Sequence, residues 1–377
     1  MNHMMTETNH RRLPVGIQSF ETIRKEGYLY VDKTDIIWQL ANRGKKYNYL
    51  SRPRRFGKSV LVDTLQAYFE GKKELFEGLK IMDLEKEWKH YPVIRLDMSR
   101  GGANAGTLRS YLNLRFKEYE NLYGITPDPT ARLADRFHGI LSAANKKTGL
   151  QVAILIDEYD SPLQHSWKTP QHDECTEVYR EVFAILKADD NYERFVFITG
   201  ITKFTQISLF SVLNNLTNIS FDAPYAALCG ITKDEIKENF MPEITMMGEQ
   251  NGWSTDETIE QLQAYYDGYH FSRKNMVDVF NPFSLINALS DNELRNYWAA
   301  SGATSLLPKF VDDLDIRLKK GYMSGTYLLG IPNHEVRQAL NEIVLPTLAM
   351  RKTNDTMSTQ AFLNLYMDTG NLPEAMK

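Results

Sequence analysis

Short runs of apolar and β-branched residues alternate, over residues 13–221, with longer segments in which apolar residues recur every three or four positions. The short runs predict strands at Tyr47–Leu50, Val93–Met98, Val152–Ile156 and Phe195–Thr199. The longer segments predict helices at Ser59–Glu70, Leu108–Tyr123, Leu133–Ala144 and Glu177–Lys187. Strands that alternate with helices form a parallel sheet with helices on both faces, so we predict an α/β domain over residues 13–221. The polar, unpatterned residues 1–12 predict a disordered tail.

The pattern changes after residue 221. Two stretches, Thr232–Glu235 and Ser254–Glu257, have the capping-box spacing that begins a helix. Three later segments also predict helices, at Pro282–Leu289, Thr304–Leu318 and Val336–Leu345. No series of strands is evident here. We therefore predict a smaller, mostly α-helical domain over residues 222–325.

Composition and charge narrow the class of protein. A chain of 377 residues with 42% hydrophobic and 24% charged residues is long enough for two folded domains and is not intrinsically disordered. The net charge of −4 excludes a generally basic surface, so nucleic-acid binding would need a local basic patch. The two cysteines, Cys175 and Cys229, form neither a disulfide framework nor a metal motif, which indicates a reducing compartment.

Membrane insertion and secretion are not indicated. No apolar run approaches the roughly 20 residues that a membrane helix needs. The first twelve residues also lack the apolar core of a signal peptide. We therefore expect a cytoplasmic protein that does not contact a membrane.

The most informative segment runs from Ser51 to Ser59, between a predicted strand and a predicted helix. A phosphate-binding loop needs backbone amides that point inward, a lysine that reaches the β- and γ-phosphates, and a hydroxyl group that binds Mg²⁺. Gly57 lets the backbone approach the phosphates, Lys58 supplies the charge, and Ser59 supplies the hydroxyl group. The positive end of the following helix dipole also favours binding of an anion. The full motif has a glycine at the position of Arg52, so the loop alone is also compatible with a basic surface turn. The expected nucleotide contacts in the loop are Arg54, Arg55, Phe56, Gly57, Lys58, Ser59 and Val60.

A pair of acids follows the apolar strand Val152–Ile156. In a nucleotide hydrolase, Asp157 at this position would bind Mg²⁺, and Glu158 would orient or deprotonate the attacking water. Solvated acids at the end of a strand are the ordinary alternative. The loop and the acid pair nevertheless both follow strands of one parallel sheet, where such sheets bind ligands. Together they predict a P-loop NTPase fold in which Lys58 and Glu158 are catalytic and Ser59 and Asp157 are metal ligands.

Two further features refine the nucleotide prediction. Thr199 or Thr202, at the end of the strand Phe195–Thr199, could sense the γ-phosphate, although a simple strand exit explains them equally well. No N-K-x-D motif for reading guanine is present, so ATP is the expected substrate, with Mg²⁺ as cofactor. We expect hydrolysis to act as a conformational switch.

The arginines of the loop leave alternatives open. Arg54 and Arg55 could stabilise transition-state charge, hold the loop closed through carboxylates, or contact phosphates of a partner. One rival function is a module that binds nucleotide without hydrolysing it. Another is a nucleic-acid-interaction protein whose patch of Arg52, Arg54 and Arg55 binds DNA phosphates.

With these motifs, the chain resembles the bacterial AAA-ATPase-like family. The resemblance rests on LPVGIQSFETIRKEGYLYVDKT, SRPRRFGKS, ILIDEYDSPL, ITGITKFTQISLFS and YYDGYHF, over about residues 13–310. Family members likewise lack the first loop glycine and are arginine-rich there. The resemblance implies that the strand Phe195–Thr199 lies between the loop strand and the Asp157 strand. It also implies that Lys58 and Ser59 belong to the nucleotide loop and that Asp157 and Glu158 are the metal-binding and catalytic acids.

Members of this family often continue into a PD-(D/E)XK nuclease-like domain. Residues 326–377 resemble the segment that leads into it, without the later acids that would hold Mg²⁺ at a phosphodiester. We therefore expect no nuclease activity from this chain.

The aromatic segment YYDGYHF contains Tyr265, Tyr266, Tyr269 and Phe271 around Gly268. Such a cluster can stack on adenine or on a nucleic-acid base. Packing between the two predicted domains is the interpretation that we favour.

Overall fold

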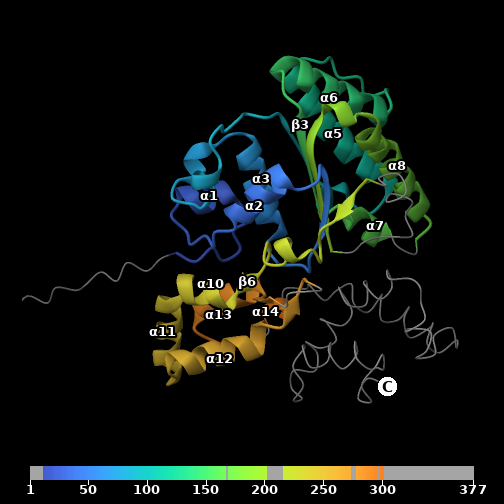
Figure 1. Cartoon of the computed structure of the whole chain (residues 1–377). Coiled ribbons are helices and arrows are strands. Elements are labelled where there is room, and N and C mark those ends of the chain that lie inside the picture. Colours follow the sequence, from blue (N-terminus) through green and yellow to red (C-terminus); the bar gives the residue numbers. More distant parts are fainter. Residues whose placement is uncertain (1–11, 167–168, 202–214, 273–276, 296, 301–377) are drawn as a thin grey trace, which may run out of the picture.

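The computed structural model describes residues 12–166, 169–201, 215–272, 277–295 and 297–300 (Figure 1). The strands of its larger sheet are β1 (Tyr47–Ser51), β2 (Val93–Asp97), β3 (Val152–Asp157), β4 (Glu193–Gly200) and β5 (Thr217–Asn218). The longer helices of this part are α2 (Thr34–Arg43), α3 (Lys58–Phe69), α5 (Ala105–Tyr123), α6 (Leu133–Thr148) and α8 (His172–Ala188). Shorter helices are α1 (Phe20–Lys25), α4 (Ile81–Leu84) and α7 (Ser161–Ser166).

The five strands form one parallel sheet in the order β2-β3-β4-β1-β5. Strand β4 therefore lies between β1 and β3, as the family resemblance implies. Leu50 of β1 pairs with Thr199 of β4, and Ile156 of β3 pairs with Ile198 of β4. This register brings the carboxyl ends of β1 and β3 to the same edge of the sheet, where open α/β sheets bind ligands.

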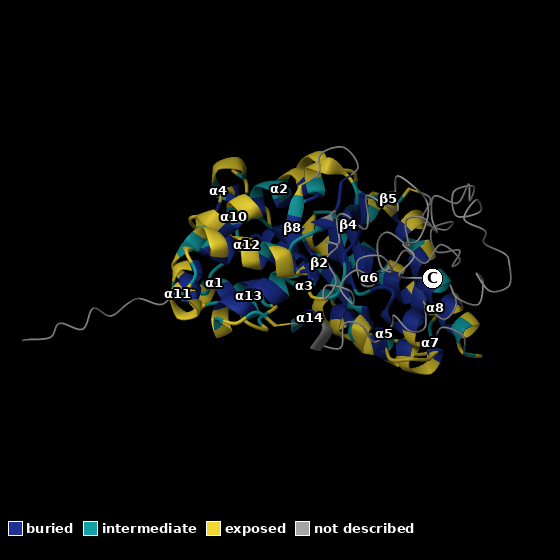
Figure 2. Ribbon diagram, turned by 90° about the horizontal axis from the view of Figure 1, so that it is seen from below, coloured by how far each residue is buried: buried dark blue, intermediate teal, exposed yellow. Residues whose placement is uncertain are grey.

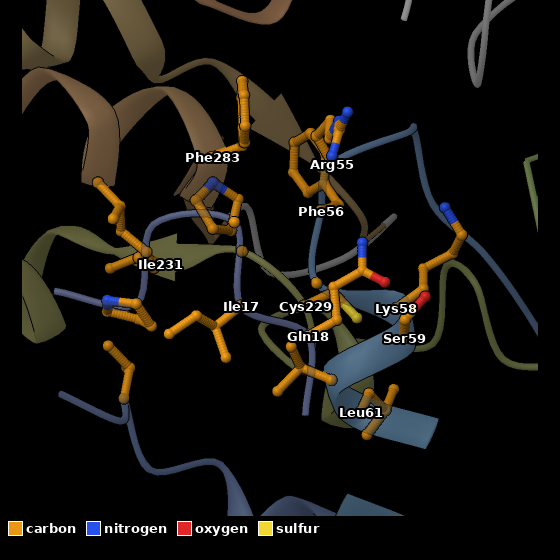
Figure 3. A pocket seen from close by; sticks show the side chains of 18 of the residues that line it. Ile17, Gln18, Arg55, Phe56, Lys58, Ser59, Leu61, Cys229, Ile231 and Phe283 are labelled. Atoms are coloured by element: carbon orange, nitrogen blue, oxygen red, sulfur yellow. The ribbon is translucent and has the colours of Figure 1, made fainter. Parts of the chain in front are cut away.

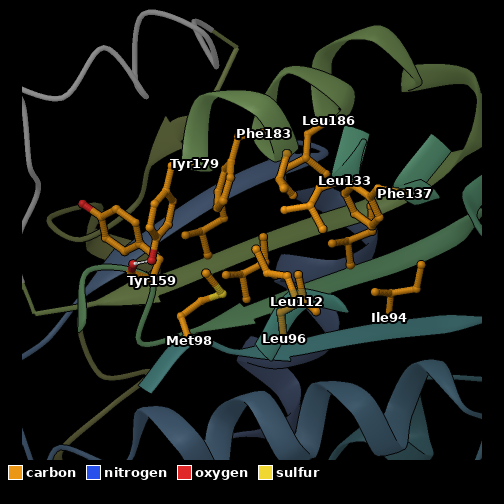
Figure 4. Packing of buried hydrophobic residues seen from close by; sticks show 14 of the residues in the cluster. Ile94, Leu96, Met98, Leu112, Leu133, Phe137, Tyr159, Tyr179, Phe183 and Leu186 are labelled. Carbon is orange, nitrogen blue, oxygen red and sulfur yellow. Dashed lines mark hydrogen bonds between the residues drawn. The ribbon is translucent and has the colours of Figure 1, made fainter. Parts of the chain in front are cut away.

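Each face of the sheet is covered by helices, and the first five residues of the central strand β3, Val152–Ile156, are all apolar. In β3, Ile154 and Ile156 face α5, α6 and α8, whereas Ala153 and Leu155 face α1, α2 and α3 (Figure 1). Figure 4 shows the first of these layers, in which Leu112, Phe137 and Phe183 pack on the sheet. A strand that is buried on both faces loses the alternation of apolar and polar residues. This explains the continuous apolar run that predicted β3.

The predicted strands and helices of this part are confirmed, with ends that differ by a few residues. Helix α5 begins at Ala105 because Asn104 caps it, three residues before the predicted start at Leu108. Helix α8 begins at His172, five residues before the predicted start at Glu177. Strand β5 was not predicted, since two residues are too short to show a periodic pattern.

The segment after residue 221 contains α10 (Lys233–Asn239), α11 (Met241–Asn251), α12 (Thr255–Tyr266), α13 (Pro282–Asp291) and α14 (Tyr297–Ala300). Both predicted capping boxes are present, with Thr232 and Ser254 accepting backbone N–H bonds at the starts of α10 and α12. The described residues are mostly helical, as expected, but they also contain a short series of strands that the sequence did not show. Strands β6 (Ile231–Thr232), β7 (Tyr269–His270) and β8 (Asp278–Phe280) form a small antiparallel sheet in the order β6-β8-β7. The predicted helices at 304–318 and 336–345 lie outside the described residues.

These helices enclose a separate apolar cluster, around Ile236, Phe240 and Leu262. Residues from the start of the chain, Leu13 and Val31, pack against this cluster. Figure 2 shows the exposed outer surfaces of α10 and α11 and the buried face of α13. Among the described residues, no helix is both long enough and apolar enough to cross a bilayer.

Candidate functional site

The loop between β1 and α3 lies at the carboxyl edge of the sheet. Strand β1 ends at Ser51, and α3 begins at Lys58. Gly57 has a φ angle of 83°, a left-handed conformation that residues with a side chain rarely adopt. This conformation turns the chain into a helix of 12 residues, so the first backbone N–H groups of α3 and its positive dipole end point into the loop. The backbone therefore has the form of an anion-binding loop.

The side chain of Lys58 lies inside this loop and is buried. Its ammonium donates hydrogen bonds to the carbonyl oxygens of Arg52, at 3.1 Å, and of Pro53, at 3.0 Å. The Nζ atom also lies 3.7 Å from Oε1 of Glu158, across the loop from β3. A buried ammonium needs such partners, and it can exchange them for phosphate oxygens at little cost. The structure thus brings the lysine and the glutamate to the same place.

Asp157, the last residue of β3, lies directly behind the loop. Its carboxylate accepts a hydrogen bond from the Ser59 hydroxyl and another, of 3.0 Å, from the backbone N–H of Glu158. Burial raises the pKa of Asp157 to about 6, and the Ser59 hydrogen bond and the Lys58 charge oppose this rise. A carboxylate beside a hydroxyl in a buried place is a donor pair that suits a hard cation such as Mg²⁺.

Glu158 has a φ angle of 51°, which is unusual for a residue with a side chain. The surrounding turn holds this conformation: the Tyr159 N–H donates to the carbonyl oxygen of Thr199 at 2.9 Å, and the Tyr179 hydroxyl donates to that of Tyr159 at 2.5 Å. Figure 4 shows the second of these bonds. Gly200 leaves the room for this turn, because a Cβ atom there would lie 2.7 Å from the Tyr159 ring. The strained residue therefore presents its carboxylate toward Lys58.

A cavity of about 510 Å³ opens beside the loop. One end is polar and includes Lys58, Ser59, Glu158 and Ser99. The other end is mostly apolar and is lined by Ile17, Leu29, Val31, Ile231, Phe240, Phe283 and Ile286. Figure 3 shows Ile17 and Ile231 in the apolar part, with Lys58 and Ser59 at the opposite side. A pocket of this size, with a charged end and an apolar end, suits a molecule that joins an anionic group to a flat apolar one.

The structure brings most of the predicted site residues together. The cavity wall includes Arg54, Arg55, Phe56, Gly57, Lys58, Ser59, Val60 and Glu158. Asp157 reaches the site through Ser59. Thr199 is not part of the wall: it is fully buried in β4, and its hydroxyl has no hydrogen-bond partner among the described residues. Thr202 lies outside the described residues.

Several wall residues were not predicted from the sequence. They belong to the segment Pro14–Gln18 before α1 and to the segment Leu228–Ile231 before α10. Both segments are short and mostly apolar. Pro14–Gln18 belongs to a stretch that carries the family resemblance, but nothing in either segment marks it as part of a ligand site. Asp97 was also missed: it pairs with Asp157 in the register of β2 and β3, which places a second carboxylate at this edge. Its position at the end of an apolar strand was the available signal.

Arg52 is not available for binding nucleic acid, which counts against the rival function based on a patch of Arg52, Arg54 and Arg55. Its side chain is only 1% exposed. The guanidinium donates to the carbonyl oxygens of Ser51 and Ser220, both at 2.8 Å, and of Tyr225, at 3.1 Å. Hydrogen bonds to three carbonyl groups compensate the burial of this charged side chain. Arg52 is therefore not part of a basic surface patch.

A parallel sheet covered by helices on both faces, with a lysine-bearing loop before α3 and an acid pair after β3, defines a P-loop NTPase-like fold. Residues 14–210 match the family model described as "Predicted AAA-ATPase". This match covers more than half of the 377 residues, and the chain belongs to the AAA-ATPase-like family.

The chain is also similar to a protein of Azotobacter chroococcum mcd 1 that is named "Uncharacterized protein in vnfD 5'region". The two sequences are 37% identical over 314 residues, which is 81% of this chain. The chain spans 56% of the length of that relative. The likeness therefore extends past α8 into the helices after residue 221.

Proposed function

We propose that this protein binds ATP together with Mg²⁺ in the cavity beside the loop and hydrolyses it. The proposal rests mainly on one observation: Lys58 Nζ lies 3.7 Å from Glu158 Oε1. Both residues line the cavity, whose other end is apolar. The polar end would hold the triphosphate, and the apolar end would hold the adenine base.

Each residue has a role that follows from its chemistry. Lys58 would leave the carbonyl oxygens of the loop and bind the β- and γ-phosphates. Ser59 and Asp157 would hold Mg²⁺, which when bound neutralises phosphate charge. Glu158 would then be released from Lys58 and could accept a proton from the attacking water. Among the described residues, no group of three histidine, cysteine or acidic side chains forms a metal cage, so phosphate oxygens and water would supply the other ligands.

Hydrolysis would act as a switch, and this also rests on geometry. Residues of the cavity wall come from the loop, from the start of the chain and from α13. A nucleotide between these elements would contact all of them, and loss of the γ-phosphate would remove the contacts made through Lys58 and Glu158. Within the described residues, the two parts of the chain contact each other directly, as a switch requires. We propose domain limits of 13–221 and 222–325 for these parts.

Calorimetric titration with MgATP tests the proposal. We expect the wild type to bind and the Lys58→Ala variant to lose at least 100-fold in affinity, because a charge-assisted phosphate contact is lost in a buried site. Lys117→Ala, which removes an exposed lysine of α5, is the matched control and should bind like the wild type. Equal affinities for all three proteins would contradict the proposal. Binding without any phosphate release would instead identify a non-hydrolysing module.

A further inference from the structure

The nucleotide loop is held from outside by residues of the segment 269–298. Phe56, in the middle of the loop, is fully buried between Tyr269 and Phe271, with ring centroids 4.6 Å and 5.6 Å away. Together with Ala226 and Val279, these residues form an apolar cluster of their own. The cluster joins the loop to the small sheet β6-β8-β7. For the segment YYDGYHF we favoured packing between the two parts of the chain. This interpretation is confirmed for Tyr269 and Phe271.

Arg52 forms the second attachment. Its guanidinium lies 3.9 Å from the centroid of the Phe271 ring while it donates to three carbonyl oxygens. A cation–π contact gains strength when it is shielded from water, as it is here. Arg52 occupies the position at which the full phosphate-loop motif has a glycine. Its side chain thus fixes the first residue of the loop to Ser220, which follows β5, and to Phe271, which follows β7.

Two further contacts come from the helices. The indole Nε1–H of Trp298, in α14, donates a 2.9 Å hydrogen bond to the carbonyl oxygen of Arg54. The guanidinium of Arg55 lies 4.9 Å from the centroid of the Phe283 ring, in α13. Figure 3 shows Arg55 and Phe56 together beside Phe283, with Lys58 and Ser59 further along the loop. Four of the five residues from Arg52 to Phe56 are therefore held by aromatic side chains of this segment.

We propose that Arg52 and Phe56 are positioning residues, and that Phe271 and Trp298 clamp the nucleotide loop in its phosphate-binding shape. The inference rests on the proposed function and adds a means of regulation to it. A loop binds phosphate well only if its amides are already oriented, since ordering a loose loop on binding costs conformational entropy. The clamp supplies that order in place of the missing glycine turn. By thermodynamic reciprocity, a nucleotide in the loop must also act on the clamp.

Two variants test the clamp. Phe271→Leu keeps an apolar side chain but removes the π face from Arg52, and Trp298→Phe removes one N–H donor while keeping a ring. We expect each to weaken the binding of both MgATP and inorganic tripolyphosphate, about tenfold for Phe271→Leu and about fivefold for Trp298→Phe. Tyr265→Leu is the matched control, because Tyr265 belongs to the same aromatic segment but is 51% exposed. It should bind both ligands as the wild type does.

Two measurements separate positioning from mere stability. In a double-mutant cycle, the loss of affinity in Arg52→Met/Phe271→Leu should be smaller than the sum of the losses in the two single variants, because both substitutions remove the same cation–π contact. Saturating MgATP should change the tryptophan emission of the wild type, and Trp298→Phe should abolish most of that change. Wild-type affinities in both Phe271→Leu and Trp298→Phe, or an emission change that persists in Trp298→Phe, would overturn the clamp alone. A wild type that binds neither MgATP nor tripolyphosphate would overturn the proposed function and the clamp with it.

Discussion

The Lys33 ammonium lies 2.5 Å from the Glu235 carboxylate, although 202 residues separate them in the sequence. Lys33 precedes α2 and lines the cavity, and Glu235 belongs to the capping box at the start of α10. Both side chains are largely buried. Burial lowers the pKa of Lys33, and the Glu235 charge opposes this effect. The pair therefore joins the start of the chain to the helices after residue 221.

Removing one member of this pair should cost more than removing both. We expect Lys33→Met to lower the free energy of unfolding by about 3 kcal/mol, because it leaves the largely buried Glu235 charge without its counter-ion. The double variant Lys33→Met/Glu235→Gln should recover at least half of that loss. Urea denaturation of the wild type, Lys33→Met, Glu235→Gln and the double variant measures the four values. Strictly additive effects would show that the two side chains do not interact.

Glu158→Gln should separate binding from hydrolysis. Glutamine keeps the shape of the side chain and the unusual backbone angle but cannot accept a proton from water. Loss of the negative charge beside Lys58 should leave MgATP affinity unchanged or slightly higher, while phosphate release falls at least 100-fold. A colorimetric phosphate assay at saturating MgATP measures the release. Near-normal turnover in this variant would remove Glu158 from the role of general base.

Ile17→Ser should weaken the binding of the base but not of the phosphates. Ile17 lies in the apolar end of the cavity, so the substitution removes apolar contact area from the adenine position (Figure 3). We expect MgATP affinity to fall about tenfold and tripolyphosphate affinity to stay the same. Leu84→Ser, at an exposed leucine outside the cavity wall, is the control. An equal loss for both ligands would place the base elsewhere.

Glu193→Gln should reduce the pH dependence of stability. Glu193 is buried at the start of β4 and accepts a 2.5 Å hydrogen bond from the Tyr47 hydroxyl. Burial raises the pKa of this carboxyl group to about 8, from an ordinary value of 4.5. The folded protein thus binds a proton that the unfolded chain releases, so the contribution of Glu193 to stability is complete below about pH 4.5 and is lost as the pH rises toward 8.

The wild type should accordingly lose about 2 kcal/mol between pH 6 and pH 8 through this one group, and Glu193→Gln should not. The measurement is the free energy of unfolding in urea at the two pH values. Glu174→Gln, at an exposed glutamate of α8, should behave as the wild type does. Parallel pH profiles for the wild type and Glu193→Gln would show that Glu193 is already ionised at pH 6.

The local pattern of the chain determined the four longer strands of the larger sheet and the two residue clusters that form the polar end of the site. A strand buried on both faces, such as β3, tends to be continuously apolar, and this pattern is visible in the sequence whatever the strand pairs with. Gly57, Lys58 and Ser59 could be recognised because a phosphate loop fixes residue types at adjacent positions. The capping boxes at Thr232 and Ser254 could also be recognised from the sequence, because their hydrogen bonds join residues only three positions apart.

Only the tertiary structure decided what surrounds that polar end. The apolar end of the cavity joins Ile17 to Ile231, and the loop is clamped by Phe271 and Trp298, from segments more than 200 positions away. Such contacts leave no periodic signal. The aromatic segment of Phe271 indicated packing between the two parts of the chain, but nothing in the sequence showed that its partner is the loop. Arg52 is the clearest case: its sequence neighbours suggested a basic patch, and its burial depends on carbonyl groups and a ring that the fold alone brings to it.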